Sequence, residues 1–325
     1  MVMEDLFLSD IYLARQRIAS IIRRTPLVYS PSLKAMTGTN VLLKQENLQV
    51  TGAFKIRGAS NKILSLSDKD RERGVITVSS GNHGLAVSYL AKKLETKATI
   101  CVPKPVPNNK RQAIKALGAE LVVKGNNADE AMEYADQLQA ERGMTMVHPF
   151  DDLEIIAGQG TIGIELFEDF PDMDTVIVPL SGGGLMSGIA FVVKSIMPKI
   201  RVIGVSMERG PAMVESLRAG KIVDIVEEPT LADALAGGLN MDNKYTFPMV
   251  QEYVDETVLV SEEEISEAIL FCLNQHRTVI EGGAAVGIAA LLTNKVQLLG
   301  KNIVVVLSGA NISLQVLKKI LAEEI

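Results

Sequence analysis

Residues 74–84 have the sequence GVITVSSGNHG, in which a Val/Ile-rich segment runs directly into a turn of small residues. The apolar residues of Gly74–Val78 do not alternate with polar ones, which is typical of a strand buried on both faces. A helical pattern over Leu85–Lys93 follows the turn. A strand that is covered on both faces and continues into a helix is the repeating unit of an α/β fold with a parallel sheet.

The same alternation of strands and helices continues through most of the chain. Because domains usually contain roughly 100–200 residues, a chain of 325 residues predicts two lobes. We therefore expect an α/β protein in which each lobe is an open, mostly parallel sheet flanked by helices. A further helix is predicted over Asn109–Leu117, and further strands over Val41–Lys44, Ala98–Val102, Glu120–Lys124, Thr175–Pro179, Arg201–Val205, Glu256–Val260 and Ile303–Leu307.

Composition and charge exclude several classes of protein. The chain has 33 Lys and Arg against 39 Asp and Glu, a net charge of −6 without any basic block, so binding to nucleic acid is not expected. Cys101 and Cys272 lie in apolar runs and predict buried thiols in a reducing compartment. The three histidines have no partners at ligand spacing, so no metal is predicted.

Neither a leader nor a membrane anchor is predicted. Residues Met1–Arg17 lack the basic-then-apolar order of a signal peptide. No apolar run approaches the roughly 18 residues of a membrane span. These patterns predict a soluble, cytoplasmic protein.

Lys55 is the first residue that carries chemistry. It lies between Phe54 and Ile56, at the start of a helical run. A lysine in this position is either a surface side chain whose stem lies along apolar residues, or a desolvated amine that can form a Schiff base. The segment alone leaves both interpretations open.

Two further polar motifs come at the ends of predicted strands. Residues 79–84, SSGNHG, place small side chains and free backbone amides at a helix N-terminus, which favours an anion or forms an ordinary capped turn. Ser308 follows the predicted strand Ile303–Leu307. Open α/β sheets bind ligands at the carboxyl ends of their strands.

The segment SGGGLMSG over residues 181–188 is a Gly-rich turn between a strand and an apolar helix. Such a turn lets several backbone N–H groups surround a phosphate. It lacks the ending of a Walker loop. It comes close to a dinucleotide fingerprint, and Glu208 stands after the next strand, where the ribose-binding acid is expected. A dinucleotide-dependent oxidoreductase therefore stays an alternative.

Together the four motifs supply one amine, one phosphate cradle and two polar contacts, an inventory that fits pyridoxal phosphate. Their order resembles that of the fold type II (tryptophan synthase β-like) pyridoxal-phosphate enzymes, in particular the threonine dehydratase and serine racemase branch. The resemblance extends from RTPL at residues 24–27, through IAGQGT at residues 156–161, to SGAN at residues 308–311.

The resemblance implies a role for each site residue. Lys55 forms the Schiff base with the cofactor and acts as the base at Cα, and Ser80 is the acid/base on the opposite face. The cofactor contacts are Phe54 beside the ring, Asn82 on the ring hydroxyl, Gly182, Gly183, Gly184 and Leu185 around the phosphate, and Ser308 on the pyridine nitrogen. The substrate carboxylate is held by Ser79, Ser80, Gly81, Asn82 and His83.

The resemblance also implies a lobe arrangement and a reaction. Residues 51–147 form the smaller, substrate-side lobe, residues 1–50 and 148–325 form the larger, cofactor-binding lobe, and the cofactor lies in the cleft. The expected reaction is β-elimination of water from an amino acid of the L-threonine or L-serine type, which gives a 2-oxo acid and ammonia. A homodimer or homotetramer is expected.

Departures from the family pattern leave alternatives open. Ala53, Ser181 and Ala234 stand where many relatives have other small residues, and Ser206 and Ala212 stand where serine racemase has acidic cation ligands. Residues 237–247 resemble the hydroxyectoine-utilisation dehydratases, whereas Ser80 favours a serine racemase. A non-catalytic amino-acid-binding protein has no need of Lys55.

Overall fold

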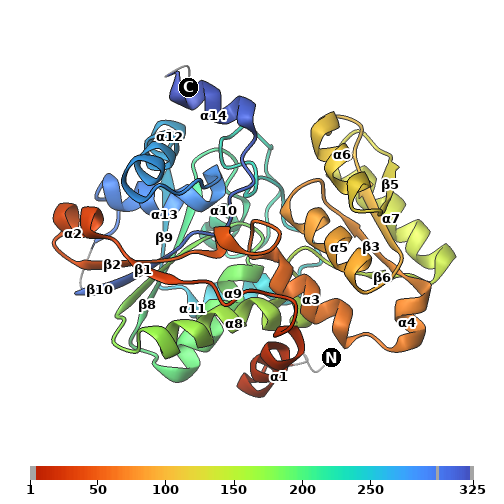
Figure 1. The fold of residues 1–325 in the computed structure, drawn as a ribbon, viewed down its shortest axis with the longest axis horizontal. Helices are drawn as coiled ribbons and strands as arrows, with labels where there is room; N and C mark the ends of the chain where they lie inside the picture. The colour runs from red at the N-terminus through yellow and green to blue at the C-terminus, as the bar shows by residue number, and fades with distance from the viewer. Residues whose placement is uncertain (1–4, 298–299, 323–325) are drawn as a thin grey trace. The chain divides into compact units, whose positions relative to one another are not determined.

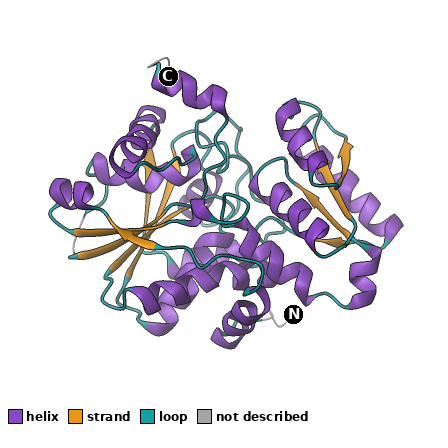
Figure 2. Ribbon diagram, in the orientation of Figure 1, coloured by secondary structure: helices purple, strands orange, loops and turns teal. Residues whose placement is uncertain are grey.

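The computed structural model describes residues 5–297 and 300–322 and forms two compact units. Unit 1 consists of the residues up to Ile22 together with Lys55–Gln159. Unit 2 consists of Arg23–Phe54 and the residues from Gly160 onward. Each unit has its own sheet, so each is described separately (Figure 2).

The sheet of unit 2 has six strands in the order β1-β2-β10-β7-β8-β9. All neighbouring strands are parallel except β1 and β2, which are antiparallel. Each parallel pair is joined through a crossover connection instead of a tight turn. The strands are β1 (Leu27–Tyr29), β2 (Asn40–Lys44), β7 (Thr175–Pro179), β8 (Arg201–Met207), β9 (Glu256–Val260) and β10 (Asn302–Val306).

Helices cover both faces of this sheet (Figure 1). Helix α13 (Gly282–Leu292) contacts β7 to β10 on one face, and α9 (Gly184–Ile196) contacts β7 and β8 on the other. Gly287 of α13 faces Val305 and Ile177, where a Cβ atom would lie 2.8 Å from Val305 Cγ1. The other helices are α2 (Pro31–Thr37), the 3₁₀ turn Glu46–Leu48, α10 (Ala212–Ala219), α11 (Thr246–Tyr253), α12 (Glu262–Phe271), the π-helical turn Cys272–His276 and α14 (Leu314–Leu321).

Unit 1 contains a four-stranded parallel sheet in the order β5-β4-β3-β6. Side chains of α7 pack on the face of the sheet that carries Ile76 and Cys101. Its strands are β3 (Val75–Val78), β4 (Ala98–Val102), β5 (Glu120–Val123) and β6 (Thr145–Met146), and its helices are α1 (Leu8–Ile18), α3 (Lys55–Ser65), α4 (Asp68–Arg73), α5 (Asn82–Lys93), α6 (Asn108–Ala116) and α7 (Ala128–Arg142). Helix α8 (Leu153–Asp169) begins in unit 1 and ends in unit 2.

The predicted α/β class is confirmed, and all eight predicted strands are present within a few residues of their expected bounds. Strands β1 and β6 were not predicted, because segments of three and two residues carry no readable periodicity. Helix α5 begins at Asn82 rather than at Leu85, because the polar residues of its first turn hide its start.

The units differ from the expected lobes in the N-terminal segment, in residues 51–54, which belong to unit 2, and in residues 148–159, which belong to unit 1. Residues up to Ile22 belong with Lys55–Gln159. Helix α1 buries Ile11, Ala14 and Ile18, and Arg17 donates to Asn61 Oδ1 at 2.5 Å and to Glu154 Oε2 at 3.1 Å. These are contacts between segments far apart in the sequence, which no local pattern reports. In the part of the chain that the structure describes, no helix has the length and apolar character needed to cross a membrane.

Candidate active site

Lys55 is the first residue of α3 in unit 1. Its side chain is partly buried, and Nζ donates to the carbonyl oxygen of Pro149 at 2.6 Å. The sequence left a surface lysine and a desolvated amine as alternatives. In the structure the side chain is only partly exposed, and its amine is bonded to a backbone carbonyl.

The segment of residues 79–84 connects β3 to α5 in the same unit. The amide of Gly81 bonds to Ser79 Oγ at 3.3 Å. Gly84 lies so close to Ser79 that a Cβ atom would be 2.1 Å from the Ser79 carbonyl oxygen. Glycine is therefore required there, and the first turn of α5 packs directly over the preceding loop. Ser80 and Asn82 lie at this N-terminus, where backbone amides favour an anion.

His83 is buried at the start of α5, with 2 % of its surface exposed. Its Nε2 lies 2.9 Å from the carbonyl oxygen of Val147, and since that oxygen only accepts, Nε2 carries the proton. Nδ1 is buried and has no hydrogen-bond partner among the described residues. Burial, and after it the positive charge of Lys55, lowers the pKa of His83 from 6.5 to about 3. The imidazole is therefore neutral and offers an acceptor nitrogen.

The Gly-rich segment in unit 2 leaves β7 and enters α9 at Gly184. Gly183 adopts the left-handed conformation, with φ 89°. A Cβ atom on it would lie 2.8 Å from Thr246 Cβ and 2.9 Å from Met213 Cε, so only glycine suits this position. Among the described residues, the buried amides of Gly182, Gly183, Gly184 and Leu185 have no acceptor. Buried amides without acceptors at a helix N-terminus suit a phosphate.

Ser308 follows β10 after the single residue Leu307 and is buried, with 3 % exposed. Its carbonyl oxygen accepts a hydrogen bond from the amide of Phe54 at 3.0 Å. Phe54 is the residue immediately before Lys55 in the chain. The turn after Ser308 is held by Glu281, whose amide donates to Gly309 O at 3.0 Å and whose Oε2 accepts from the amide of Asn311 at 3.1 Å.

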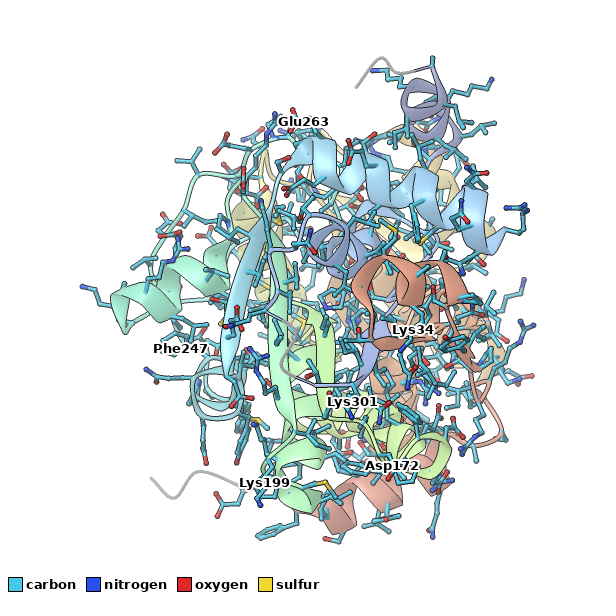
Figure 3. The ribbon with its side chains drawn as sticks, turned by 90° about the vertical axis from the view of Figure 1, so that its left-hand side faces the viewer. Lys34, Asp172, Lys199, Phe247, Glu263 and Lys301 are labelled. Carbon is cyan, nitrogen blue, oxygen red and sulfur yellow. The ribbon has the colours of Figure 1, made fainter. Side chains whose placement is uncertain are left out.

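The Gly-rich turn and Ser308 lie at the same edge of the unit 2 sheet, because β7 and β10 are neighbouring parallel strands. Figure 3 labels Asp172, Lys199 and Lys301, the residues that precede β7, β8 and β10, and all three lie toward one end of the strands. Glu263, which follows β9, is labelled at the opposite end. The candidate cofactor residues of unit 2 therefore lie at the carboxyl edge.

The predicted site residues thus fall into two groups. Unit 1 holds Lys55, Ser79, Ser80, Gly81, Asn82 and His83, and unit 2 holds Phe54, Gly182, Gly183, Gly184, Leu185 and Ser308. Sequence reasoning missed Glu281, whose side chain holds the turn after Ser308. The available signal was a lone carboxylate before Gly282 in an otherwise apolar run. Among the described residues, no group of three or more His, Cys, Asp or Glu is arranged to hold a metal ion.

A family model described as pyridoxal-phosphate dependent enzyme matches residues 18–309. The chain belongs to this family. The buried amides of the Gly-rich turn and the partly buried amine of Lys55 fit a cofactor that carries a phosphate and an aldehyde. This member of the family is a pyridoxal-phosphate-dependent lyase, like the relatives named L-threonine ammonia-lyase and L-threonine dehydratase.

Two curated relatives of this pyridoxal-phosphate enzyme cover almost all of the chain. A putative threonine dehydratase of Sinorhizobium fredii is 48% identical over 312 residues, which cover 96% of this chain and 94% of the relative. The L-threonine ammonia-lyase of Thermotoga maritima is 46% identical over 314 residues, or 97% of this chain and 78% of the relative. The solved structure of maize serine racemase matches with a TM-score of 0.92 at 34% identity, covering 99% of this chain and 98% of that one.

Proposed function

We propose that this protein is a threonine dehydratase, which removes water from L-threonine and releases 2-oxobutanoate and ammonia. L-Serine is the second substrate of this class. The hydrogen bond from the Phe54 amide to Ser308 O carries the proposal. It ties the residue before Lys55 to the carboxyl edge of the sheet that bears the Gly-rich turn. The relatives named for threonine support the choice of substrate.

Each residue of the proposed site has a task. The amides of Gly182, Gly183, Gly184 and Leu185 hold the cofactor phosphate, Phe54 packs beside the ring, Asn82 bonds its hydroxyl and Ser308 donates to its nitrogen. The amides of Ser79–His83 hold the substrate carboxylate. Bound pyridoxal phosphate supplies the aldehyde that captures the substrate amine and the ring that accepts electrons.

Proton movement belongs to Lys55 and Ser80. With the cofactor bound, Lys55 Nζ would take the proton from Cα and return a proton to the β-hydroxyl, which would leave as water. Addition of one water to the released enamine would then give the 2-oxo acid and ammonia. Ser80 serves the opposite face. Ser308 donates as a neutral hydroxyl, and unlike a carboxylate it does not hold a proton on the ring nitrogen. Prompt loss of the β-hydroxyl is therefore favoured over transamination.

The Lys55→Ala variant tests this assignment. We expect it to lose turnover, and to retain no cofactor on any peptide after borohydride reduction, because Lys55 is the proposed attachment point. Lys62→Ala is a matched control, since Lys62 lies on the same helix and pairs with Asp152 at 2.5 Å. Peptide mapping that finds the reduced cofactor on another lysine of the wild-type enzyme would overturn the proposal.

Racemisation of serine is a second candidate, favoured by the match to maize serine racemase. Dehydration of hydroxyectoine is a third, favoured by residues 237–247. A substrate panel of threonine, serine, threo-3-hydroxyaspartate and hydroxyectoine separates the three candidates. Release of 2-oxo acid is measured for each substrate, and formation of D-serine from L-serine is measured by chiral chromatography. We further propose that the enzyme works in the cytoplasm and that it forms a homodimer or homotetramer. Sedimentation analysis tests the oligomeric state.

A further inference from the structure

Ser181 immediately precedes the glycines of the Gly-rich turn. Its hydroxyl donates to the carbonyl oxygen of Leu235 at 2.8 Å. Leu235 is 54 residues away in sequence and buried, with 7 % exposed. One side-chain hydrogen bond thus joins the segment that holds the proposed phosphate site to a separate segment, residues 230–235, here named the 230–235 turn.

The 230–235 turn is itself firmly anchored. Glu262, at the first turn of α12, accepts from Thr230 Oγ1 and from the amide of Leu231, each at 2.6 Å. The amide of Ala232 bonds to Thr230 Oγ1 at 3.0 Å, and the amide of Leu235 bonds to Ala232 O at 2.7 Å. The Leu235 carbonyl is therefore a fixed acceptor.

The opposite side of the 230–235 turn packs against the N-terminus of α13. A Cβ atom on Gly282 would lie 2.1 Å from Leu231 O, and one on Gly283 would lie 3.2 Å from Ala234 Cβ. Glu281, the residue before Gly282, holds the turn that follows Ser308. A continuous series of contacts therefore runs from Ser181, through the 230–235 turn and α13, to the residues around Ser308.

From these contacts we infer that Ser181 is a positioning residue: its hydrogen bond to Leu235 O holds the Gly-rich turn in the conformation that binds the cofactor phosphate. This inference rests on the proposed role of Gly182–Leu185. Gly183 meets Thr246 and Met213 on its other side, so the turn is held from both sides. Loss of the Ser181 hydroxyl releases one of them and leaves the Leu235 carbonyl without its donor.

The test compares Ser181→Ala with Ser181→Thr, which keeps a hydroxyl. The affinity of the apoprotein for pyridoxal phosphate and for pyridoxal, which lacks the phosphate, is measured by absorbance titration. We expect Ser181→Ala to raise the Kd for pyridoxal phosphate about five- to tenfold, the effect of one net hydrogen bond. The Kd for pyridoxal should stay at the wild-type value, and Ser181→Thr should restore most of the affinity.

Ser65→Ala is the matched control, because Ser65 also donates to a backbone carbonyl, Lys62 O at 2.8 Å, but belongs to unit 1, whereas the Gly-rich turn, Leu235 and Thr246 belong to unit 2. The ³¹P resonance of the bound cofactor should shift in Ser181→Ala and not in Ser65→Ala. An unchanged Kd and an unchanged ³¹P resonance in Ser181→Ala, or an equal loss of affinity for pyridoxal, would overturn the inference. Either result leaves the proposed function standing, since that depends on attachment of the cofactor to Lys55.

Discussion

At the scale of single residues, the ion pair between Lys44 and Glu165 is buried. Lys44 Nζ lies 2.6 Å from Glu165 Oε2, with side-chain exposures of 0% and 5%, and also donates to Thr25 O at 2.7 Å. Lys44→Met would leave the Glu165 carboxylate buried without its cation. We expect the free energy of unfolding to fall by about 3–5 kcal/mol, measured by denaturant titration.

The exposed pair of Arg71 and Asp68 is the control for this prediction, because the Asp68 side chain is 90% exposed. Arg71→Met should change the free energy of unfolding by less than about 1 kcal/mol. Equal effects of Lys44→Met and Arg71→Met would show that burial does not increase the contribution of the Lys44–Glu165 pair to the free energy of unfolding.

His83 makes the stability of the fold depend on pH. Its folded-state pKa of about 3 lies below the ordinary 6.5, so both states are neutral above pH 6.5. Between pH 6.5 and 3 only the unfolded chain takes up this proton, and stability falls by roughly 1.4 kcal/mol for each pH unit. Melting temperatures of wild type and His83→Asn across this range should show a shallower acid decline in the variant. Parallel curves would mean that His83 is not buried in its neutral form.

At the scale of elements, α3 and α8 approach each other through Gly58 and Gly158. A Cβ atom on Gly158 would lie 2.6 Å from Gly58 Cα and 2.7 Å from Arg57 O, which are backbone atoms that cannot rotate away. Gly158→Ala must therefore push the two helices apart. We expect a loss of about 1–3 kcal/mol in the free energy of unfolding.

Gly238→Ala is the comparison for this helix crossing, since no heavy atom lies within 4 Å of a Cβ at that position. Its unfolding midpoint should stay close to wild type. Because α3 begins with Lys55, Gly158→Ala should also weaken cofactor attachment, measured by visible absorbance. A Gly158→Ala variant as stable as Gly238→Ala would contradict the close approach.

At the scale of the whole molecule, each unit contains one buried thiol: Cys101 in unit 1 and Cys272 in unit 2. Burial raises the pKa of Cys101 to about 11 and that of Cys272 to about 12, so little thiolate forms near neutral pH. We expect a disulfide reagent to label native protein at far below one thiol per chain. In denaturant, Cys101→Ser and Cys272→Ser each leave one thiol that reports the opening of one unit. Rapid labelling of the native chain would contradict the burial of these thiols.

The sequence by itself determined the α/β class, eight of the strands and the candidate residues for cofactor chemistry. Buried parallel strands are continuous Val/Ile runs, and phosphate-binding turns need glycines, so both leave a local signature. Only the tertiary structure decided that residues up to Ile22 join unit 1, that His83 is neutral and that Glu281 holds the turn after Ser308. It alone joined Ser181 to Leu235. Burial and contacts between distant segments set these properties, and neither follows from the order of neighbouring residues.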